Sequence, residues 1–272
     1  MSETVTVPDA LVDVVGAATV EPLRATGDPR IVTVRLIDGD GDAGGVRFLK
    51  YAPTDLARPE GHQHLVAAEA ERLRWLDGRA RTPRLWGAGE RDGVTWLATH
   101  GLEGTSSHLP EHRMDLRATI AAIAGGLREL HDTVAVDDCP FDARYETEVD
   151  AVAARLGAGL VDVAHLRPAL ARIKPERLVE ILRTSPRKGD DDLVVTHGDA
   201  AMPNVLVAAG SCTGLVDLGR LGVADRHRDL ADCATSLAAN IGPEALPPFF
   251  EAYGIEPDAA RLDQHTLIAE LS

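Results

Sequence analysis

The sequence predicts an α+β fold with a sheet-rich N-terminal part and a mainly helical C-terminal part. Short β-type runs separated by turns fill most of residues 1–98, with one helical repeat among them. Beyond residue 105, apolar residues recur mainly at helical spacing. With 272 residues the chain can form two closely packed lobes, which we expect at 1–98 and 105–272, joined by a hinge at 99–104.

The N-terminal elements are strands and turns around a single predicted helix. In that helix Leu65, Leu73 and Leu76 recur at helical spacing together with Glu69. A segment rich in Gly and Asp between the first two strands is typical of a hairpin turn. In chain order we expect a strand at 32–37, the turn at 38–45, a strand at 46–51, the helix at 64–76, and strands at 82–87 and 94–99.

The C-terminal elements are mainly helices, interrupted by one pair of strands. In the first helix Ile120, Ile123, Leu127 and Leu130 share one face, which we expect to be buried. Two short valine-rich runs later in the chain predict strands. In order, we expect helices at 116–131, 145–156 and 175–184, strands at 193–195 and 205–207, and helices at 228–240 and 243–253.

A spaced set of polar residues surrounds these two strands. His197-Gly198-Asp199 follows the first strand, Asn204 lies five residues after Asp199, and Asp217 lies thirteen residues after Asn204. Phosphoryl transfer needs a carboxylate that orients and deprotonates the accepting hydroxyl, and oxygen ligands for the metal ions that bridge the nucleotide phosphates. We predict that Asp199 is the catalytic residue. Asn204 and Asp217, the latter on the neighbouring strand, would hold Mg²⁺, which prefers carboxylate and amide oxygens.

A simpler interpretation is that these residues are loop polars that cap strands, because Asp and Gly are common in turns. That interpretation would suffice for an isolated His-Gly-Asp. The complete spacing between two β-type runs instead indicates a kinase-type site.

Lys50, one of only three lysines, lies at the end of an apolar predicted strand, and Glu69 lies inside the following helix. A lysine that reaches the ATP phosphates and is held by a helix glutamate is the recurring kinase arrangement. The alternative is a strand-edge lysine with its charge in solvent, next to a solvated glutamate. Glu71 is the nearest competitor of Glu69, but it lies about 200° away around the helix. We therefore predict that Lys50 and Glu69 bind the nucleotide.

The stretch His-Gly-Leu-Glu-Gly at 100–104 lies between the last N-terminal strand and the first C-terminal helix. Kinases hold adenine through backbone groups at such a hinge. We therefore expect His100 and Leu102 to contribute backbone contacts to the nucleotide.

Two segments carry a family resemblance. Residues 194–204 (Val-Val-Thr-His-Gly-Asp-Ala-Ala-Met-Pro-Asn) and residues 217–227 (Asp-Leu-Gly-Arg-Leu-Gly-Val-Ala-Asp-Arg-His) resemble the aminoglycoside 3′-phosphotransferase family of bacterial resistance kinases. Streptomycin 3″-kinases share this signature. The segments at 130–131, 138–142 and 159–162 also match the family pattern. The similarity runs from about Thr26 to the C-terminus and is strongest over 127–230.

The resemblance implies a protein-kinase-like two-lobe fold and the same site roles. The family's catalytic aspartate corresponds to Asp199, and its metal ligands correspond to Asn204 and Asp217. His197 has the residue type of a base near neutral pH, yet in this family arrangement we expect it to brace the loop. The family's nucleotide loop falls at 26–31, where Gly27 is a candidate contact.

Several positions depart from the family pattern. Pro29 stands near an expected serine and lacks an N–H that could meet a phosphate. The chain ends Leu-Ile-Ala-Glu-Leu-Ser where the family usually has Leu-Leu-Asp-Glu-Phe-Phe, which leaves Glu270 as a candidate substrate contact. The loop after Asp162 and the stretch 235–240 are also poor in acids. Either other acids replace them or the substrate is less cationic.

Composition narrows the class of partner. The formal net charge of −15 argues against nucleic acid, because phosphate backbones recruit Lys- and Arg-rich faces. A negative field would attract cationic small molecules, although plain solubility explains the charge equally well. There is no apolar run of about 18 residues and no signal-peptide pattern, so we expect no membrane association. The three cysteines show no disulfide or metal spacing, so we expect a cytoplasmic protein. We also expect a monomer or weak dimer.

We therefore predict a kinase that uses Mg²⁺ and ATP, with GTP as the alternative nucleotide. It would phosphorylate a hydroxyl of an aminoglycoside or a related aminocyclitol or sugar-bearing antibiotic and so confer resistance. One alternative is a metabolic kinase of the same fold that acts on a sugar, choline or homoserine. Another is a pseudokinase that binds nucleotide without turnover, against which the intact set of Lys50, Asp199, Asn204 and Asp217 argues. The acceptor hydroxyl stays open.

Overall fold

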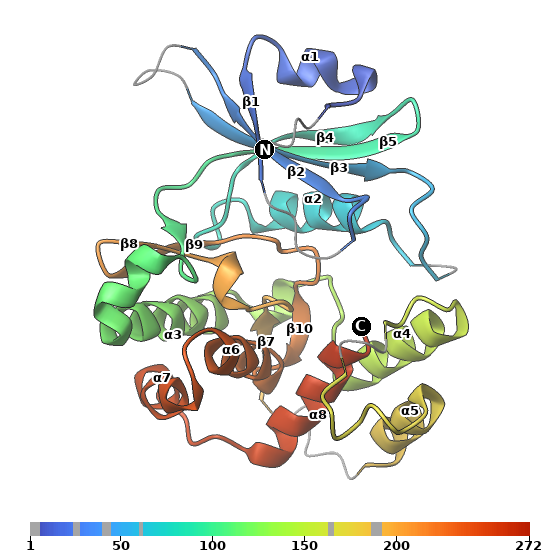
Figure 1. The fold of residues 1–272 in the computed structure, drawn as a ribbon, viewed down its shortest axis with the longest axis vertical. Coiled ribbons are helices and arrows are strands. Elements are labelled where there is room, and N and C mark those ends of the chain that lie inside the picture. The colour runs from blue at the N-terminus through green and yellow to red at the C-terminus, as the bar shows by residue number, and fades with distance from the viewer. Residues whose placement is uncertain (1–5, 24–27, 40–44, 60–61, 163–165, 186–191) are drawn as a thin grey trace. The chain divides into compact units, whose positions relative to one another are not determined.

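The structure is a computed structural model that describes residues 6–23, 28–39, 45–59, 62–162, 166–185 and 192–272 (Figure 1). The chain divides into two compact units. Unit 1 comprises 1–57, 62–78 and 82–102, and unit 2 comprises 58–61, 79–81 and 103–272. Unit 1 is built around an antiparallel sheet and unit 2 is mostly helical, which confirms the predicted α+β class.

Unit 1 is a five-stranded antiparallel sheet with the strand order β1-β2-β3-β5-β4. Side chains alternate across β3, so Leu49 and Lys50 lie on opposite faces. Leu49 packs with Leu11, Val34 and Leu36 in a buried cluster on one face. The elements are η1 (Asp9–Leu11), α1 (Val12–Val15), β1 (Thr19–Pro22), β2 (Val32–Ile37), β3 (Val46–Pro53), α2 (Leu65–Leu76), β4 (Leu85–Arg91) and β5 (Val94–His100).

The predicted strand at 82–87 was displaced, because β4 begins only at Leu85 and continues to Arg91. The glycines in this stretch resemble a turn in the sequence. In the structure the Trp96 side chain of β5 lies over them, and a Cβ added at Gly87 would come within 3.2 Å of its ring. Cross-strand packing therefore keeps a glycine-rich segment extended. The short helix α1 was also not expected, since four residues carry no helical period.

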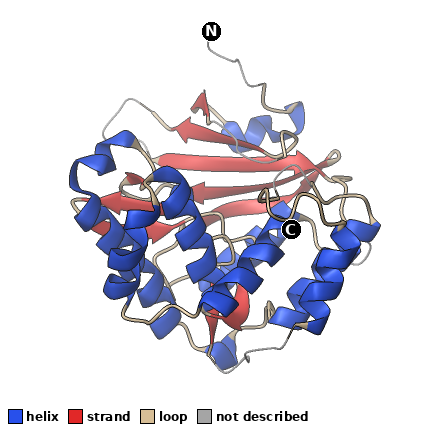
Figure 2. Cartoon of the chain, turned by 60° about the horizontal axis from the view of Figure 1, so that its bottom comes forward, coloured by secondary structure: helices blue, strands red, loops and turns tan. Residues whose placement is uncertain are grey.

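Unit 2 is dominated by helices (Figure 2). The predicted apolar face of α3 is buried, and Asp115 caps its first turn by accepting a hydrogen bond from the Ala118 N–H (2.9 Å). The elements before the catalytic segment are β6 (Thr105–Ser106), η2 (Pro110–Asp115), α3 (Leu116–Thr133), η3 (Val136–Asp138), α4 (Tyr145–Gly157) and α5 (Pro175–Thr184). Those from it onward are β7 (Leu193–Thr196), η5 (Met202–Asn204), β8 (Val205–Ala208), β9 (Ser211–Leu215), β10 (Gly222–Asp225), α6 (His227–Asn240), η6 (Pro243–Ala245), α7 (Leu246–Tyr253) and α8 (Ala259–Glu270).

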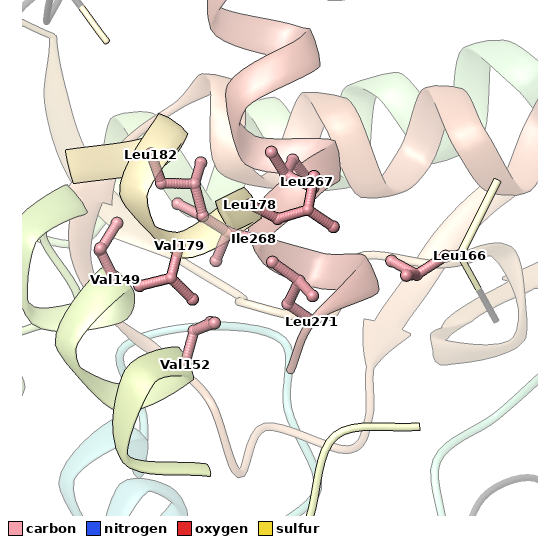
Figure 3. Close-up of a cluster of buried hydrophobic side chains, with 9 residues drawn as sticks. All are labelled: Val149, Val152, Leu166, Leu178, Val179, Leu182, Leu267, Ile268 and Leu271. Atoms are coloured by element: carbon pink, nitrogen blue, oxygen red, sulfur yellow. The ribbon is translucent and has the colours of Figure 1, made fainter. Parts of the chain in front are cut away.

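A buried apolar cluster joins α4, α5 and α8 (Figure 3). The helix α8 had not been predicted, because only His265, Leu267 and Ile268 are buried within it. Leu267 and Ile268 nevertheless reach the cluster, and Leu271 just beyond the helix is fully buried there. Burying such a leucine contributes roughly 1.5–3 kcal/mol, so the cluster fixes the end of the chain to α4 and α5.

Two small sheets hold the loops that carry the predicted site. Strand β7 pairs with β10 in one antiparallel sheet, and β6, β8 and β9 form the other. Asp217 was expected on a strand, but β9 already ends at Leu215. Asp217 instead lies in the following loop with a left-handed φ of 62°. In the described part of the chain, no helix is both long and apolar enough to cross a membrane.

Candidate active site

The catalytic loop, residues 197–204, connects β7 to β8 and carries Asp199. His197 is fully buried at its start. Its Nδ1 accepts the backbone N–H of Asp199 (3.2 Å), and its Nε2 lies 2.9 Å from the carbonyl oxygen of Val216. Because Nδ1 is an acceptor, the ring proton sits on Nε2 and is donated to Val216. This is the bracing position that the sequence suggested for His197.

Asp229 on α6 fixes the start of the same loop, and its role was missed. Its carboxylate accepts the backbone N–H groups of His197 (2.6 Å) and Gly198 (2.8 Å) and lies 2.9 Å from Nε2 of His131. Burial acts to raise the pKa of this carboxyl, but the hydrogen bond and charge of His131 and the charges of His197 and Arg228 outweigh it and lower the pKa. A fully buried, charged acceptor thus orients two successive peptide groups.

Gly198 has a φ of +85°, which favours glycine, and it is tightly enclosed. An added Cβ would lie against the carbonyl group of Arg220, with 2.7 Å to its carbon and 2.7 Å to Nη1 of Arg228. Arg228 donates from Nη1 to that carbonyl (3.0 Å) and to Oγ1 of Thr196 (3.1 Å), and from Nη2 to Glu148 (3.1 Å). The catalytic loop and the loop that follows Asp217 are therefore packed directly against each other.

Helix α6 contacts the catalytic loop at two further levels. Cys233 donates from Sγ to the carbonyl oxygen of Ala200 (2.8 Å), and Oγ of Ser236 accepts the N–H of Met202 (3.0 Å). Together with Asp229, these residues form a stripe at helical spacing that follows the loop from residue 197 to residue 202. The loop is therefore held mainly by groups outside it.

Asn204 and Asp217 are linked to the same framework. The Asn204 amide donates from Nδ2 to the carbonyl oxygen of Asp199 (2.9 Å), and the Asn204 carbonyl accepts the N–H of Val216 (3.0 Å). Asn204 therefore ties Asp199 to the residue before Asp217. Because its amide nitrogen is engaged, Oδ1 is the atom left for a ligand, and it has no hydrogen-bond partner among the described residues.

These donors suit a magnesium ion. Mg²⁺ takes oxygen ligands, keeps several waters and commonly binds one or two protein carboxylates together with substrate phosphates. Within the described ranges, no group of three or more His, Cys, Asp or Glu side chains lies close enough to hold a metal ion by itself. The amide oxygen of Asn204 and the carboxylate of Asp217 are enough protein ligands for Mg²⁺ when nucleotide phosphates and water complete its coordination shell.

In unit 1 the structure brings Lys50 and Glu69 together. Nζ of Lys50 lies 2.8 Å from Oε2 of Glu69, whose residue is 5% exposed. The competing Glu71 lies on an exposed part of α2 and accepts from Gln63 (2.8 Å). Helix α2 begins at Leu65 because the preceding residue, His64, caps it by accepting the Val66 N–H.

The predicted hinge residues differ in their backbone bonding. The N–H of His100 is already donated to the Arg84 carbonyl oxygen (2.9 Å), and that of Gly101 to the Val46 carbonyl oxygen (2.7 Å). Leu102 makes no backbone hydrogen bond to the described residues. Leu102 is therefore the better placed of the two candidates to donate an N–H to a base. Gly27 lies outside the described residues.

Among the described residues, the Glu270 side chain makes no hydrogen bond or ion pair to the catalytic loop. Its carboxylate pairs with Arg167, with 3.1 Å from Oε1 and 3.2 Å from Oε2 to Nε. Arg167 also reaches Asp263 (3.2 Å). An acceptor contact by Glu270 would thus have to compete with an existing ion pair.

Relatives at the level of sequence are phosphotransferases. The model of a family described as the phosphotransferase enzyme family matches residues 24–265. An aminoglycoside 3′-phosphotransferase of Streptomyces fradiae is 37% identical over 230 residues, covering 81% of this chain and 81% of that protein. A streptomycin 3″-kinase of Streptomyces griseus is 34% identical over 267 residues, covering 91% and 93%.

Solved structures give the same result. The crystal structure of a type VIII aminoglycoside 3′-phosphotransferase has a TM-score of 0.80 at 31% identity and covers 97% of this chain and 98% of its own. An aminoglycoside phosphotransferase of Streptomyces rimosus in complex with ADP and streptomycin has a TM-score of 0.78 at 25% identity, covering 96% of each chain. The kinase-like fold predicted from the sequence is confirmed.

Proposed function

The chain belongs to the phosphotransferase enzyme family, and from that membership we propose that it transfers the γ-phosphoryl group of ATP to a hydroxyl of an aminoglycoside and so confers antibiotic resistance. The relatives are named as aminoglycoside 3′-phosphotransferases and a streptomycin 3″-kinase, and one neighbouring structure holds ADP together with streptomycin. The net charge of −15 suits a cationic acceptor.

Asp199 is the proposed catalytic residue. Its carboxylate accepts the proton of the acceptor hydroxyl while the hydroxyl oxygen forms a bond to the γ-phosphorus. The bond from the γ-phosphorus to the bridging oxygen breaks, and its electron pair leaves with ADP. The role of the surrounding protein is to hold Asp199 in place, because this chemistry depends mainly on positioning and electrostatic stabilisation.

Asn204 and Asp217 are the proposed ligands of Mg²⁺, which when bound neutralises charge on the phosphates. In unit 1, Lys50 would hold the phosphates while Glu69 keeps its ammonium group oriented. The backbone N–H of Leu102 and the carbonyl of His100 would bind the adenine base. Gly27 stays a proposed phosphate contact. Glu270 is proposed as an acceptor contact only after release from Arg167.

The observation that carries this proposal is the shared backbone framework of the three unit 2 residues. The Asn204 side chain bonds to the Asp199 carbonyl, and the Asn204 carbonyl bonds to the residue before Asp217. A structural loop would not need an amide whose nitrogen is fixed and whose oxygen is left for a ligand. The spacing read from the sequence thus corresponds to one connected unit.

Mg²⁺-dependent ATP consumption with a panel of acceptors tests the proposal. Kanamycin, neomycin, streptomycin, a hygromycin-type aminocyclitol, choline and simple sugars would each be offered to the wild-type protein. Turnover with an aminoglycoside, lost by a factor of about 10² or more in a folded Asp199→Asn variant, supports the proposal. Turnover only with a metabolite, or an unchanged rate in that variant, would contradict it. A cytoplasmic location and a monomeric or weakly dimeric state also stay predictions.

A further inference from the structure

Asp232 on α6 is a carboxylate that the framework around the catalytic loop does not use. Asp229, Asp232, Cys233 and Ser236 lie at positions i, i+3, i+4 and i+7 and therefore share one helix face. Three of these four residues bond to the catalytic loop. Asp232 is the one of the four whose side chain makes no hydrogen bond or ion pair to the described residues, and the residue is partly buried.

The register of these contacts places Asp232 at the level of Asp199. Asp229 bonds to Gly198, and Cys233 bonds to Ala200. Asp232 and Asp199 each immediately precede a member of the Cys233–Ala200 pair. Their charges also act on one another. Burial, then the charge of Asp229 and, more weakly, that of Asp199 raise the pKa of Asp232 to about 7, against the opposing charges of Arg228 and Arg220.

A partly buried carboxylate that has no side-chain partner among the described residues, and that feels the charges of two other carboxylates, is most stable when a cation joins it. In the described structure, neither Arg228 nor Arg220 forms an ion pair with Asp232. Arg228 donates to Glu148 instead. The rest of α6, residues 235–240, contains no acid. Aminoglycosides carry ammonium groups on ring carbons next to hydroxyls. An acceptor whose hydroxyl lies at Asp199 therefore brings an ammonium group close to Asp232.

We propose that the carboxylate of Asp232 binds an ammonium group of the acceptor next to the hydroxyl that Asp199 receives, and so determines specificity for cationic acceptors. This inference rests on the proposed function. It also assigns a replacement for the acids that the sequence lacks at 235–240. Asp232 makes no bond to the loop, so its role is in acceptor binding and not in holding Asp199.

The test compares wild type with Asp232→Asn, which keeps the shape and removes the charge. With kanamycin as the acceptor, KM should rise roughly tenfold or more, the loss expected for one charge-assisted bond. The kcat should change by less than about threefold, and KM for Mg²⁺·ATP should stay constant. Asp232→Glu should retain most of the affinity. Raising the salt concentration should reduce the difference between wild type and Asp232→Asn.

Glu251→Gln on α7 is the matched control, because it removes one exposed negative charge away from the loop and should leave KM unchanged. Asp232→Ser is a second charge-free variant, so the result does not depend on the folding of one substitution. An unchanged kanamycin KM in both charge-free variants, or a fall in kcat alone, would overturn the inference while wild-type turnover leaves the proposed function standing. A wild-type protein that turns over no aminoglycoside would overturn both.

Discussion

Replacing Gly198 by alanine should damage the catalytic loop far more than the same replacement at Gly210. Both glycines have a left-handed φ, +85° and +75°, so both substitutions carry the backbone strain of about 1–2 kcal/mol. They differ in their surroundings. An added Cβ at Gly210 would meet only the Ala118 Cβ at 3.8 Å, whereas at Gly198 it would press on the Arg220 carbonyl and on Arg228.

The clash at Gly198 should add roughly 1–3 kcal/mol, because backbone and a buried arginine must shift. The total is then about 2–5 kcal/mol for Gly198→Ala, compared with about 1–2 kcal/mol for Gly210→Ala. At about 2 °C per kcal/mol for a chain of this size, Tm should fall by about 4–10 °C in the first variant and about 2–4 °C in the second.

Activity separates strain from misplacement. A displacement of the order of 1 Å at Asp199 can cost about 10² in rate, so Gly198→Ala should lose about two orders of magnitude in kcat. Gly210→Ala lies in the β8–β9 turn and should keep its kcat. Thermal unfolding and steady-state kinetics at a temperature where both variants are folded make the comparison. Equal falls in Tm together with an unchanged kcat in Gly198→Ala would refute the packing argument.

Three further predictions concern charged groups. Lys50→Met should lose about 10² or more in turnover and about 1–3 kcal/mol in stability, because the buried Glu69 carboxylate loses the Lys50 ammonium group. Adding Glu69→Gln should restore the stability but not the turnover, and a double variant that regains both would make the pair purely structural. Burial lowers the pKa of His265 to about 4 from 6.5, so its contribution to stability is complete above pH 6.5 and lost as pH falls towards 4. Between pH 7 and pH 5, the free energy of unfolding measured in urea should fall by about 2 kcal/mol less in His265→Gln than in wild type. An equal fall in both proteins would count against this prediction. Arg167→Gln frees Glu270 and should lower KM for a cationic acceptor roughly two- to fivefold if Glu270 contacts it; a constant KM removes Glu270 from the acceptor site.

Much of the fold could be predicted because its elements carry strong local signals. Helix α5 runs from Pro175 to Thr184 as expected, with a proline in its first turn and an apolar stripe. Strand β2 follows from short-range pattern as well, whereas the pairing of Lys50 with Glu69 was predicted from the recurring kinase arrangement. Helix α8 was missed because its burial is confined to one end, and β4 was displaced because glycines under Trp96 have no strand propensity of their own.

The candidate site was predictable where chemistry dictates residue type and spacing, as for Asp199, Asn204 and Asp217. Their roles are still predictions. Asp229 could not be found in this way, because its partners lie 31 or more residues away along the chain and are mostly backbone groups. In the sequence, Asp229 is an aspartate between Arg228 and Leu230 in the first turn of a helix, where acids are common. The role of Asp229 in holding the catalytic loop follows from its tertiary contacts and not from its spacing along the sequence.

The stripe on α6 has an evolutionary consequence. The same helix face that fixes the catalytic loop carries the residue that we assign to acceptor recognition. A substitution at position 232 could favour a new drug. Its neighbours on the same helix face, Asp229, Cys233 and Ser236, hold the catalytic loop, so their replacement would disturb turnover of every drug. Adaptation through this face should therefore proceed by single changes at 232, with strong epistasis towards its neighbours. Broader shifts in resistance profile would have to arise on other elements.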